Sequence, residues 1–430
     1  MSSKSKATVT TEDEKLAPVP RLRFPEFQNA EVWDTGKLGD VADFVNEKVP
    51  LERVTLESYV STENILPDYG GVTRASKLPN TGSVTRYRPD DTLVSNIRPY
   101  LKKVWVADKE GGASNDVIVI RAKQRLVAKY LSCMLKNDDF INFVMTGAKG
   151  VKMPRGDIAS MKAYPTLYPS KPEQQKIANC LTTLDEVIAA QSQKLDALKT
   201  HKKGLMQQLF PREGETLPRL RFPEFQDAPE WVEIPIGQKV KLLSGYPFDG
   251  ADILEARGGK RLLRGINITE GVIRHGPSID RYFHGETEQL ERYLLQENDL
   301  VIGMDGSKVG KNSSLISPLD SGSLLIQRVA RLRTGNPILI KFIFQQINSP
   351  KFHVYVDRIN TSSGIPHISA KQIQEFQVCF PSDEEQAKVV GCLTSFDDLI
   401  TAQTAKLEAL KTHKKGLMRQ LFPSPEVVEA

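Results

Sequence analysis

"PSKPEQQKIANCLTTLDEVIAAQSQKLDALKTHKKGLMQQLFP", residues 169–211, returns with changes as "PSDEEQAKVVGCLTSFDDLITAQTAKLEALKTHKKGLMRQLFP" at residues 381–423. About 28 of these 43 positions are identical in the two copies. A shorter strip, "PRLRFPEF", stands at residues 20–27 and again at 218–225. A spacing near 200 residues is far longer than that of a stacked repeat, so the sequence indicates one duplicated module. The stretches between the strips share few letters, and the second is 14 residues longer. The strips that open and close each half are therefore duplicated, while the stretches between them differ.

Each long strip carries apolar residues in steps of alternating fours and threes. This spacing predicts a helix with an a/d seam of about five heptads, roughly 55 Å long. Pro172 suits the first turn of such a helix, and Pro211 and Pro423 end the two copies. A seam of this length needs a partner, so we expect the two strips to pair with each other. The seam positions are Ile177, Leu181, Leu184, Ile188, Leu195, Leu198, Leu205 and Leu209, then Val389, Leu393, Phe396, Ile400, Leu407, Leu410, Leu417 and Leu421.

The direction of the pairing follows from the short linker. Only residues 212–217 separate the first helix from the second "PRLRFPEF", so the second variable region begins beside the end of the first helix. If the ends of that region lie close together, the second helix runs back along the first, and the coil is antiparallel. The polar seam residues are Gln191, Lys202, Gln403 and Lys414, and we predict a register that places each glutamine opposite the other helix's lysine. The alternative is that the lysines merely extend to solvent.

The two interiors mix short β-branched strands, turns and one or two helical segments, which predicts an α+β fold for each. We expect variable domains at 20–168 and 218–380, coil helices at 169–211 and 381–423, a linker at 212–217, a disordered tail at 1–19 and a tail at 424–430. The N-terminal tail has no apolar core, unlike a signal peptide. The four cysteines form no CxxC pair, which favours a reduced, cytoplasmic setting.

No catalytic motif stands out in either interior. "GMDGSKVGKNSS" resembles a phosphate-binding loop, but Gly303 and Gly310 enclose six residues instead of four, and Asn312 replaces the expected Ser or Thr. The histidines show no metal-ligand spacing, since His201 and His413 are one coil position written twice. The sequence therefore predicts a protein that binds without catalysing, with no metal and no cofactor of its own.

Basic and amide side chains gather on glycine-rich turns of both interiors. Arginine and lysine hold phosphates, arginine also faces guanine, and asparagine suits adenine. A solvated basic surface is the alternative for any one of them. The net charge of +5 permits a nucleic-acid partner without requiring one. The candidate DNA contacts are Arg86, Arg88, Asn96, Arg98, Lys102, Lys103, Lys149, Lys152 and Arg155 in the first interior, and Arg264, Asn267, Ser307, Lys308, Lys311 and Asn312 in the second.

The doubled "ALKTHKKGLM", the doubled "PRLRFPEF" and the "IPHISAKQI" that precedes "PSDEEQ" resemble the specificity subunit of type I restriction-modification enzymes. The resemblance covers nearly the whole chain after residue 19. It implies that each interior is a target recognition domain for one half of a bipartite, asymmetric site in double-stranded DNA. It also implies that the coil sets the spacing of the half-sites and docks two modification subunits, which methylate adenine with S-adenosylmethionine. Restriction subunits, using ATP and magnesium, are the further partners implied.

Two other classes of function remain open from the residues alone. A coiled-coil scaffold would join proteins and touch no DNA, and it would lack salt-sensitive DNA affinity. A self-contained enzyme would show turnover by the isolated chain.

Overall fold

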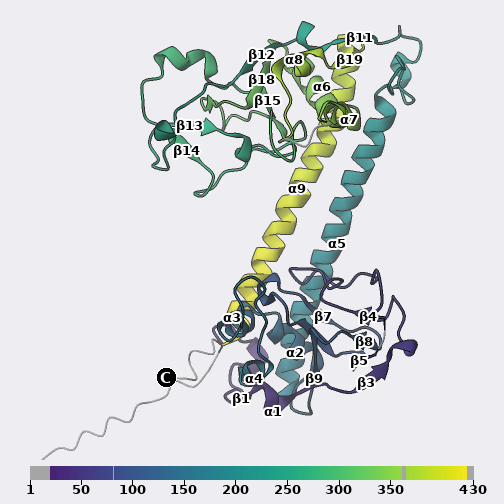
Figure 1. Ribbon diagram of the computed structural model, residues 1–430, viewed down its shortest axis with the longest axis vertical. Coiled ribbons are helices and arrows are strands. Elements are labelled where there is room, and N and C mark those ends of the chain that lie inside the picture. The colour runs from purple at the N-terminus through teal and green to yellow at the C-terminus, as the bar shows by residue number, and fades with distance from the viewer. Residues whose placement is uncertain (1–19, 81, 361–364, 424–430) are drawn as a thin grey trace, which may run out of the picture. The chain divides into compact units, whose positions relative to one another are not determined.

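The computed structural model describes residues 20–80, 82–360 and 365–423, so the tails predicted at 1–19 and 424–430 lie outside the described residues. The chain divides into two compact units, which we call unit 1 (residues 1–192 and 405–430) and unit 2 (residues 193–404). Two long helices, α5 (Lys171–Leu209) and α9 (Asp383–Leu421), each contribute residues to both units (Figure 1). These are the two long helices that the repeated strips predict.

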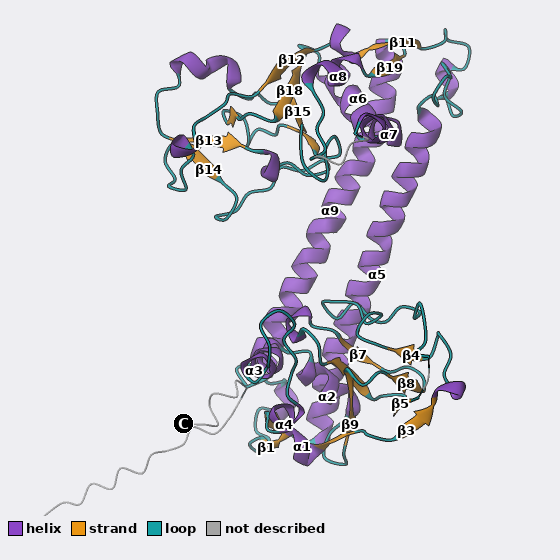
Figure 2. Ribbon diagram, viewed as in Figure 1, coloured by secondary structure: helices purple, strands orange, loops and turns teal. Residues whose placement is uncertain are grey.

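Unit 1 contains a mixed α/β domain made of short strands and short helices (Figure 2). Its strands are β1 (Asp34–Lys37), β2 (Ala42–Phe44), β3 (Lys48–Pro50), β4 (Tyr59–Val60), β5 (Ser83–Tyr87), β6 (Thr92–Ser95), β7 (Val104–Val106), β8 (Gly111–Ala113), β9 (Val117–Ala122) and β10 (Pro165–Tyr168). Its short helices are α1 (Leu38–Val41), α2 (Ala128–Leu135), α3 (Asp138–Thr146) and α4 (Ile158–Lys162).

Unit 2 has a similar mixture of elements, formed by a different amino-acid sequence (Figure 2). Its strands are β11 (Val232–Pro235), β12 (Lys241–Ser244), β13 (Lys260–Leu263), β14 (Arg281–Phe283), β15 (Leu300–Gly303), β16 (Ser313–Leu315), β17 (Leu324–Leu325), β18 (Val329–Arg333) and β19 (Gln377–Phe380). Its short helices are α6 (Pro337–Ile347), α7 (Pro350–Ile359) and α8 (Ala370–Glu375).

One four-stranded sheet in each unit has the same strand order. Unit 1 has the antiparallel order β2-β9-β6-β7, and unit 2 has the matching order β12-β18-β15-β16. A second sheet in each unit contains one parallel pair, β4 with β8 in unit 1 and β13 with β17 in unit 2. The first and last strands of each domain also pair, as β1 with β10 and β11 with β19. The duplication therefore extends to the interiors, although their sequences have diverged.

Each core is completed by the end of a long helix. In unit 1, Tyr130 lies between Trp33 and Phe422, with ring centroids 6.4 and 5.4 Å away. Phe422 directly follows α9, and Leu421 belongs to the same buried cluster. Unit 2 has the equivalent trio of Trp231, Phe342 and Phe210, in which Phe210 directly follows α5. The end of α9 thus packs into the first domain, and the end of α5 packs into the second.

The long helices run antiparallel in each unit. In unit 1, Ile177 and Leu181 from the start of α5 share a buried cluster with Met418 from the end of α9. In unit 2, Leu209 from the end of α5 shares a cluster with Val389 from the start of α9. Because the start of one helix meets the end of the other, the predicted direction is confirmed.

The predicted register of the coil is wrong for the lysines. The Lys414 ammonium donates to Asp185 in unit 1, and the Lys202 ammonium donates to Asp397 in unit 2 across 2.6 Å. Asp185 precedes Gln191 by six residues, which is about 9 Å along a helix. A layer with Gln191 opposite Lys414 would therefore need a different alignment of the helices. The same holds for Gln403 and Lys202, since the lysines take charged aspartates as partners instead.

The opening strip of each half ties the two helices together. In unit 1, the Arg23 guanidinium donates to both carboxylate oxygens of Glu173 in the first turn of α5, at 2.8 and 2.7 Å. The neighbouring Leu22 N–H donates to the Gln420 carbonyl at the end of α9, across 3.0 Å. In unit 2, Arg221 binds Glu385 of α9 in the same way. There the Leu220 N–H donates to the Gln208 carbonyl of α5. Each "PRLRFPEF" therefore joins the beginning of one helix to the end of the other.

Lys136, just after α2, is a half-buried lysine whose charge is affected by Asp185 and Lys414. Burial lowers its pKa, and Lys414 lowers it further, against the opposing effects of Asp185 and Cys133. A lowered lysine pKa means that the unfolded chain holds the proton more tightly, so the charge costs stability at neutral pH. This cost is relieved as the pH rises from the folded pKa towards about 10.4, the value for an unfolded chain.

Lys136→Met is therefore expected to raise the melting temperature at pH 7, and the gain is expected to shrink near pH 10. Thermal unfolding of the variant and the parent chain at both pH values measures this difference. An equal gain at both pH values would show that Lys136 carries no buried charge.

Among residues 20–80, 82–360 and 365–423, no helix is both long and apolar enough to cross a membrane. The same residues contain no group of three or more His, Cys, Asp or Glu side chains placed to hold a metal ion.

Candidate nucleic-acid interface

Two loops of unit 1 meet at one end of the sheet β2-β9-β6-β7. The first loop, residues 96–103, follows β6, and the second, residues 147–156, leads to α4. They are joined by backbone hydrogen bonds from Arg98 N–H to the Pro154 carbonyl (2.8 Å) and from Gly156 N–H to the Asn96 carbonyl (3.0 Å). We call residues 96–103 and 147–156 the loop pair of unit 1.

Unit 2 has a loop pair built by the same bonds. Residues 304–312 follow β15, and residues 365–369 lead to α8. Gly306 N–H donates to the Pro366 carbonyl at 3.1 Å, and Ile368 N–H donates to the Met304 carbonyl at 2.9 Å. Arg98 of unit 1 thus corresponds to Gly306 of unit 2, and Asn96 corresponds to Met304. The backbone is shared while the side chains it presents differ.

The loop pair of unit 1 contains seven of the nine predicted contacts of that unit: Asn96, Arg98, Lys102, Lys103, Lys149, Lys152 and Arg155. The guanidinium of Arg155 binds Asp116 at 3.1 Å. Lys149 and Lys152 are exposed, and neither forms an ion pair with any part of the chain that the structure describes. The loop pair therefore offers two exposed ammonium groups beside Arg98.

Four of the predicted contacts of unit 1, two of them in the loop pair, are engaged within the protein. Arg86 binds Glu47 and Glu110, each at 3.0 Å, and Arg88 also binds Glu47. The hydrogen bond from Arg86 and the charges of both arginines lower the pKa of the Glu47 carboxyl, so it stays ionised. Lys102 donates to Asp138, and Lys103 donates to the Thr62 carbonyl. These four cations are less available to a phosphate than their positions in the sequence indicate.

In unit 2, a groove of about 850 Å³ lies against the first loop of the loop pair, residues 304–312. Four of the six predicted contacts line it: Arg264, Ser307, Lys308 and Asn312. Lys308 is exposed and lies 3.8 Å from Glu270, which is a loose ion pair. Lys311 is half-buried and is absent from the lining. The groove thus gathers cationic, amide and hydroxyl groups from separate loops.

Asn267 is a structural residue, which corrects its prediction as a DNA contact. Its side chain is only 1% exposed. Its Oδ1 accepts from the Arg264 N–H, while its Nδ2 donates to the Arg274 carbonyl and to Asp280. Since all of these bonds lie inside the domain, the amide is not available to a base.

Arg274, Gln327 and Arg328 also line the groove, and the sequence analysis did not identify them. Gln327 and Arg328 interrupt a buried apolar run between β17 and β18, and both are exposed. Arg328 has a positive φ of 65° and donates to Asp305 at 3.0 Å. The sequence did offer a signal, because the polar pair Gln327 and Arg328 breaks the run "SLLIQRVARL". A continuous buried strand would not contain such a pair, so a turn could have been predicted there.

The loop between Gly303 and Asn312 does not have the structure of a phosphate-binding loop. A phosphate-binding loop leads from a strand into a helix, whose N-terminus holds the phosphates. Here the loop joins β15 to β16, an antiparallel partner. The loop therefore belongs to a hairpin.

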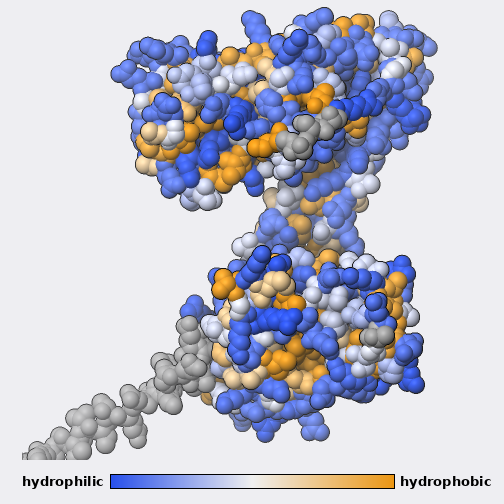
Figure 3. All heavy atoms as spheres, in the orientation of Figure 1, coloured by the Kyte–Doolittle hydropathy of each residue, from blue (hydrophilic) through white to orange (hydrophobic). Residues whose placement is uncertain are grey.

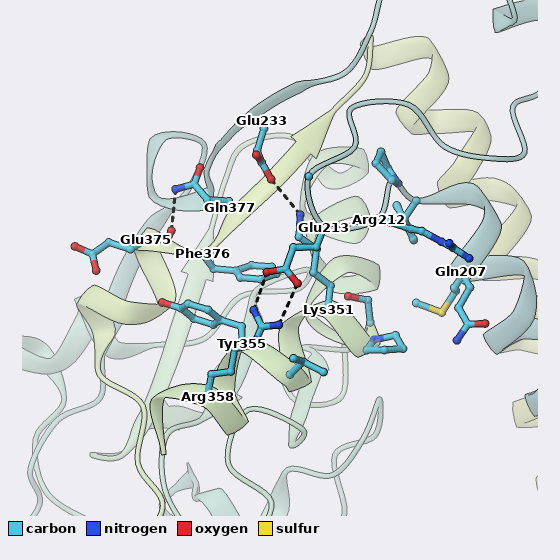
Figure 4. Close-up of a pocket in the computed structure, with 17 residues that line it drawn as sticks. Gln207, Arg212, Glu213, Glu233, Lys351, Tyr355, Arg358, Glu375, Phe376 and Gln377 are labelled. Atoms are coloured by element: carbon cyan, nitrogen blue, oxygen red, sulfur yellow. Dashed lines mark hydrogen bonds and ion pairs between the residues drawn. The ribbon is translucent and has the colours of Figure 1, made fainter. Parts of the chain in front are cut away.

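A separate pocket of about 640 Å³ lies in unit 2 at the end of α5 (Figure 4). Its apolar lining includes Phe210 from the end of α5 and Tyr355 of α7. The figure shows Arg358 directed at Glu213, a pair at 2.7 Å, and the Lys351 ammonium pairs with Glu233 at 3.1 Å. Among the described residues, no histidine or cysteine lines this pocket, and the Glu213 and Glu233 carboxylates in its lining are both engaged in ion pairs.

The visible surface of both units is largely hydrophilic, interrupted by scattered apolar patches (Figure 3). Near the loop pair of unit 1, the exposed apolar residues are Tyr100, Val151 and Met153. On the long helices, Val187 is 44% exposed and its equivalent in the repeat, Leu399, is 49% exposed. Apolar side chains exposed at the same position of both copies indicate a surface that serves twice.

Comparison with known proteins gives a consistent result. A family model described as the type I restriction modification DNA specificity domain matches residues 30–200 and 250–412. The specificity subunit of the type I restriction enzyme MjaVIII of Methanocaldococcus jannaschii is 22% identical over 420 residues, covering 95% of each chain. The specificity subunit of the EcoAI enzyme of Escherichia coli is 28% identical over 214 residues, covering 47% of this chain and 35% of that one.

The fold has a counterpart among solved structures. The crystal structure of a type I restriction-modification system S subunit from M. genitalium superposes with a TM-score of 0.61 at 17% identity, covering 94% of this chain and 99% of that chain. The two stretches that the family model matches make up most of the sequence. The chain therefore belongs to the type I restriction modification DNA specificity family.

Proposed function

We infer that this chain is the DNA-recognition subunit of a type I restriction-modification enzyme, and that each unit reads one half of a bipartite site. The observation that carries the inference is the double match of the specificity-domain model, with one match mainly in unit 1 and the other mainly in unit 2. The chain supplies recognition, and the methylation and cleavage belong to partner subunits.

The two loop pairs support an asymmetric site. They share a backbone arrangement, yet Asn96 and Arg98 in unit 1 are replaced by Met304 and Gly306 in unit 2. Sequence is read by the side chains that face base edges. Different side chains on one scaffold therefore read different bases, and the two half-sites need not be related by symmetry.

Binding to DNA is expected to be weak until the chain is assembled with its partners. The net charge is only +5, and many of the cations near the loop pairs are held by carboxylates. Non-specific affinity depends on the number of phosphates that are neutralised. Modification subunits that close around the duplex would supply the missing contacts.

The repeated apolar positions favour docking of two copies of one partner, the modification subunit. Val187 and Leu399 occupy the same position of the duplicated strip, and both are exposed. Two like surfaces on one chain accept two identical partners, each of which delivers S-adenosylmethionine to one half-site.

Val187→Asp and Leu399→Asp are each expected to remove one modification subunit, and the double variant is expected to remove both. An aspartate in an apolar contact costs its desolvation without a partner. Native mass spectrometry of the co-expressed complex counts the subunits. Ala197→Asp, at an exposed position of α5, is the control that keeps two. Two subunits bound to the double variant would place the docking surface elsewhere.

The function itself is tested by co-expressing the chain with its host's modification subunit and mapping methylated adenines across the genome. Methylation confined to one gapped, asymmetric motif is the expected result. A complex that forms but leaves no motif would indicate a scaffold. In that case binding to duplex DNA would also lack the steep salt dependence of phosphate contacts.

A further inference from the structure

Arg98 has a backbone conformation that disfavours any residue with a side chain. Its φ is +51°, in the left-handed region, where a Cβ crowds the neighbouring backbone. The equivalent turn of unit 2 uses Gly306, with a φ of +93°. Glycine adopts this region without that penalty. The turn needs no side chain for its own geometry, so the arginine in unit 1 has another role.

Two polar atoms of the same loop are buried without a partner among the described residues: Asn96 Oδ1 and Arg98 Nε. Buried polar atoms nearly always have hydrogen-bond partners, so two orphans in one loop call for an explanation. Asn96 Oδ1 lies 2.9 Å from where a Cβ of Gly156 would stand. The same position would lie 2.6 Å from Met161 and 2.8 Å from Val144, so the Asn96 oxygen faces closely packed residues inside the domain.

The nearby carboxylates are already neutralised by other cations. Asp116 pairs with Arg155 at 3.1 Å. Asp138 pairs with Lys102, and also with Lys415 at 3.1 Å. Within the described part of the chain, Arg98 forms no ion pair of its own. Its guanidinium therefore differs from those of Arg86 and Arg88, which are held by Glu47.

The surroundings of Arg98 have the character of a contact surface. Tyr100, Val151 and Met153 are apolar and exposed on the same loop pair. Lys149 and Lys152 add two exposed positive charges. Apolar side chains meet thymine methyl groups or base steps, and lysines meet phosphates, so this combination suits a nucleic-acid groove.

We propose that Arg98 is a specificity-determining residue of unit 1, which reads a guanine. This rests on the proposed function. The planar guanidinium donates two parallel hydrogen bonds to guanine O6 and N7, the pairing most often found in the major groove. Unit 2 has no equivalent group at Gly306, so it reads its half-site from the groove lined by Arg264, Asn312 and Gln327.

The test uses Arg98→Gly, which places in unit 1 the residue that unit 2 already has. Glycine suits the positive φ, so the melting temperature is expected to stay the same or rise. The variant, co-expressed with the modification subunit, is used to select bound duplexes from a randomised library. Preference for guanine at one position of one half-site is expected to fall by roughly 5- to 150-fold, while the other half-site is unchanged.

Two further variants make the result specific. Arg328→Gly is the matched control, because Arg328 also has a positive φ (65°) but belongs to unit 2, so the half-site of unit 1 must stay intact. Arg98→Lys keeps the charge and loses the planar fork, so it is expected to lose the guanine preference as well.

Each other outcome overturns the proposal. An unchanged motif for Arg98→Gly would show that Arg98 reads no base. If Arg98→Gly lowered the affinity for all duplexes equally and Arg98→Lys restored it, Arg98 would be a phosphate contact. A large drop in melting temperature for both variants would make it structural. Failure of the proposed function is distinct, because then even the parent complex would select no motif.

Discussion

Arg221→Ala is expected to lower the free energy of unfolding by about 3–5 kcal/mol, because it leaves a buried charge without its partner. The Glu385 carboxylate is only 1% exposed, and the Arg221 guanidinium contacts both of its oxygens at 2.8 Å. The hydrogen bond to Glu385 raises the pKa of Arg221, so the guanidinium keeps its charge. The same guanidinium also donates to the carbonyls of Ala228 and Pro229, which lose their donor in the variant.

Chemical denaturation of the parent chain and the variant measures this cost. Lys388→Ala is the matched control, because Lys388 and Glu224 form an ion pair between the same strip and the same helix, with about half of each side chain exposed. An exposed pair contributes about 1 kcal/mol or less. The double variant Arg221→Met with Glu385→Leu is expected to recover most of the loss. If Arg221→Ala cost no more than the control, the strip would not be what holds the helix.

Asp397→Ala is expected to lower the free energy of unfolding by about 2 kcal/mol, because Asp397 of α9 accepts two hydrogen bonds that the variant loses. The Lys202 ammonium, on a side chain that is 14% exposed, donates to Asp397 at 2.6 Å. The Gln345 amide of α6 donates to the same carboxylate at 2.9 Å. The Oε1 of Gln345 is already buried without a partner among the described residues, so the variant would leave most of this amide unsatisfied.

Denaturation of Asp397→Ala is compared with Glu408→Ala, because Glu408 pairs with Lys411 on the exposed side of α9. That pair joins neighbouring turns of one helix and is worth about 0.5 kcal/mol or less. Asp397→Asn, which retains an acceptor, is expected to lie between the two. Equal costs for all three variants would show that the lysine–aspartate contacts do not fix the register.

The coil shows which features the sequence could predict and which it could not. The apolar seam predicted two long helices, and the short linker predicted their antiparallel direction. The register was missed because a seam of repeated heptads packs almost equally well after a shift of one heptad. Partners outside the seam decide between the alternatives, and Asp185 and Asp397 stand outside the a/d pattern that the analysis followed.

The candidate interface was predictable in part, for a similar reason. Turn residues located the loops that hold Arg98 and Lys308, since glycine and asparagine mark turns by their local chemistry. The acids that engage Arg86 could not be found in the same way. Glu47 lies 39 residues earlier, and the pairing of β3 with β5 brings it close. The burial of Asn267 likewise depends on Asp280 and on loops that fold over it.

The end of α9 completes the core of the first domain, and this constrains the order in which the protein can fold. Phe422 and Leu421 complete the core around Tyr130, although more than 200 residues separate them from the rest of that core. At a synthesis rate of about 5–20 residues per second, the first domain waits roughly 10–50 s for its final piece. A chain that terminated a few residues early would carry a complete second domain and a first domain that could not close. The newborn protein therefore gains a finished first domain only after the end of α9 has been made, so closure of the first domain reports that the second has been synthesised.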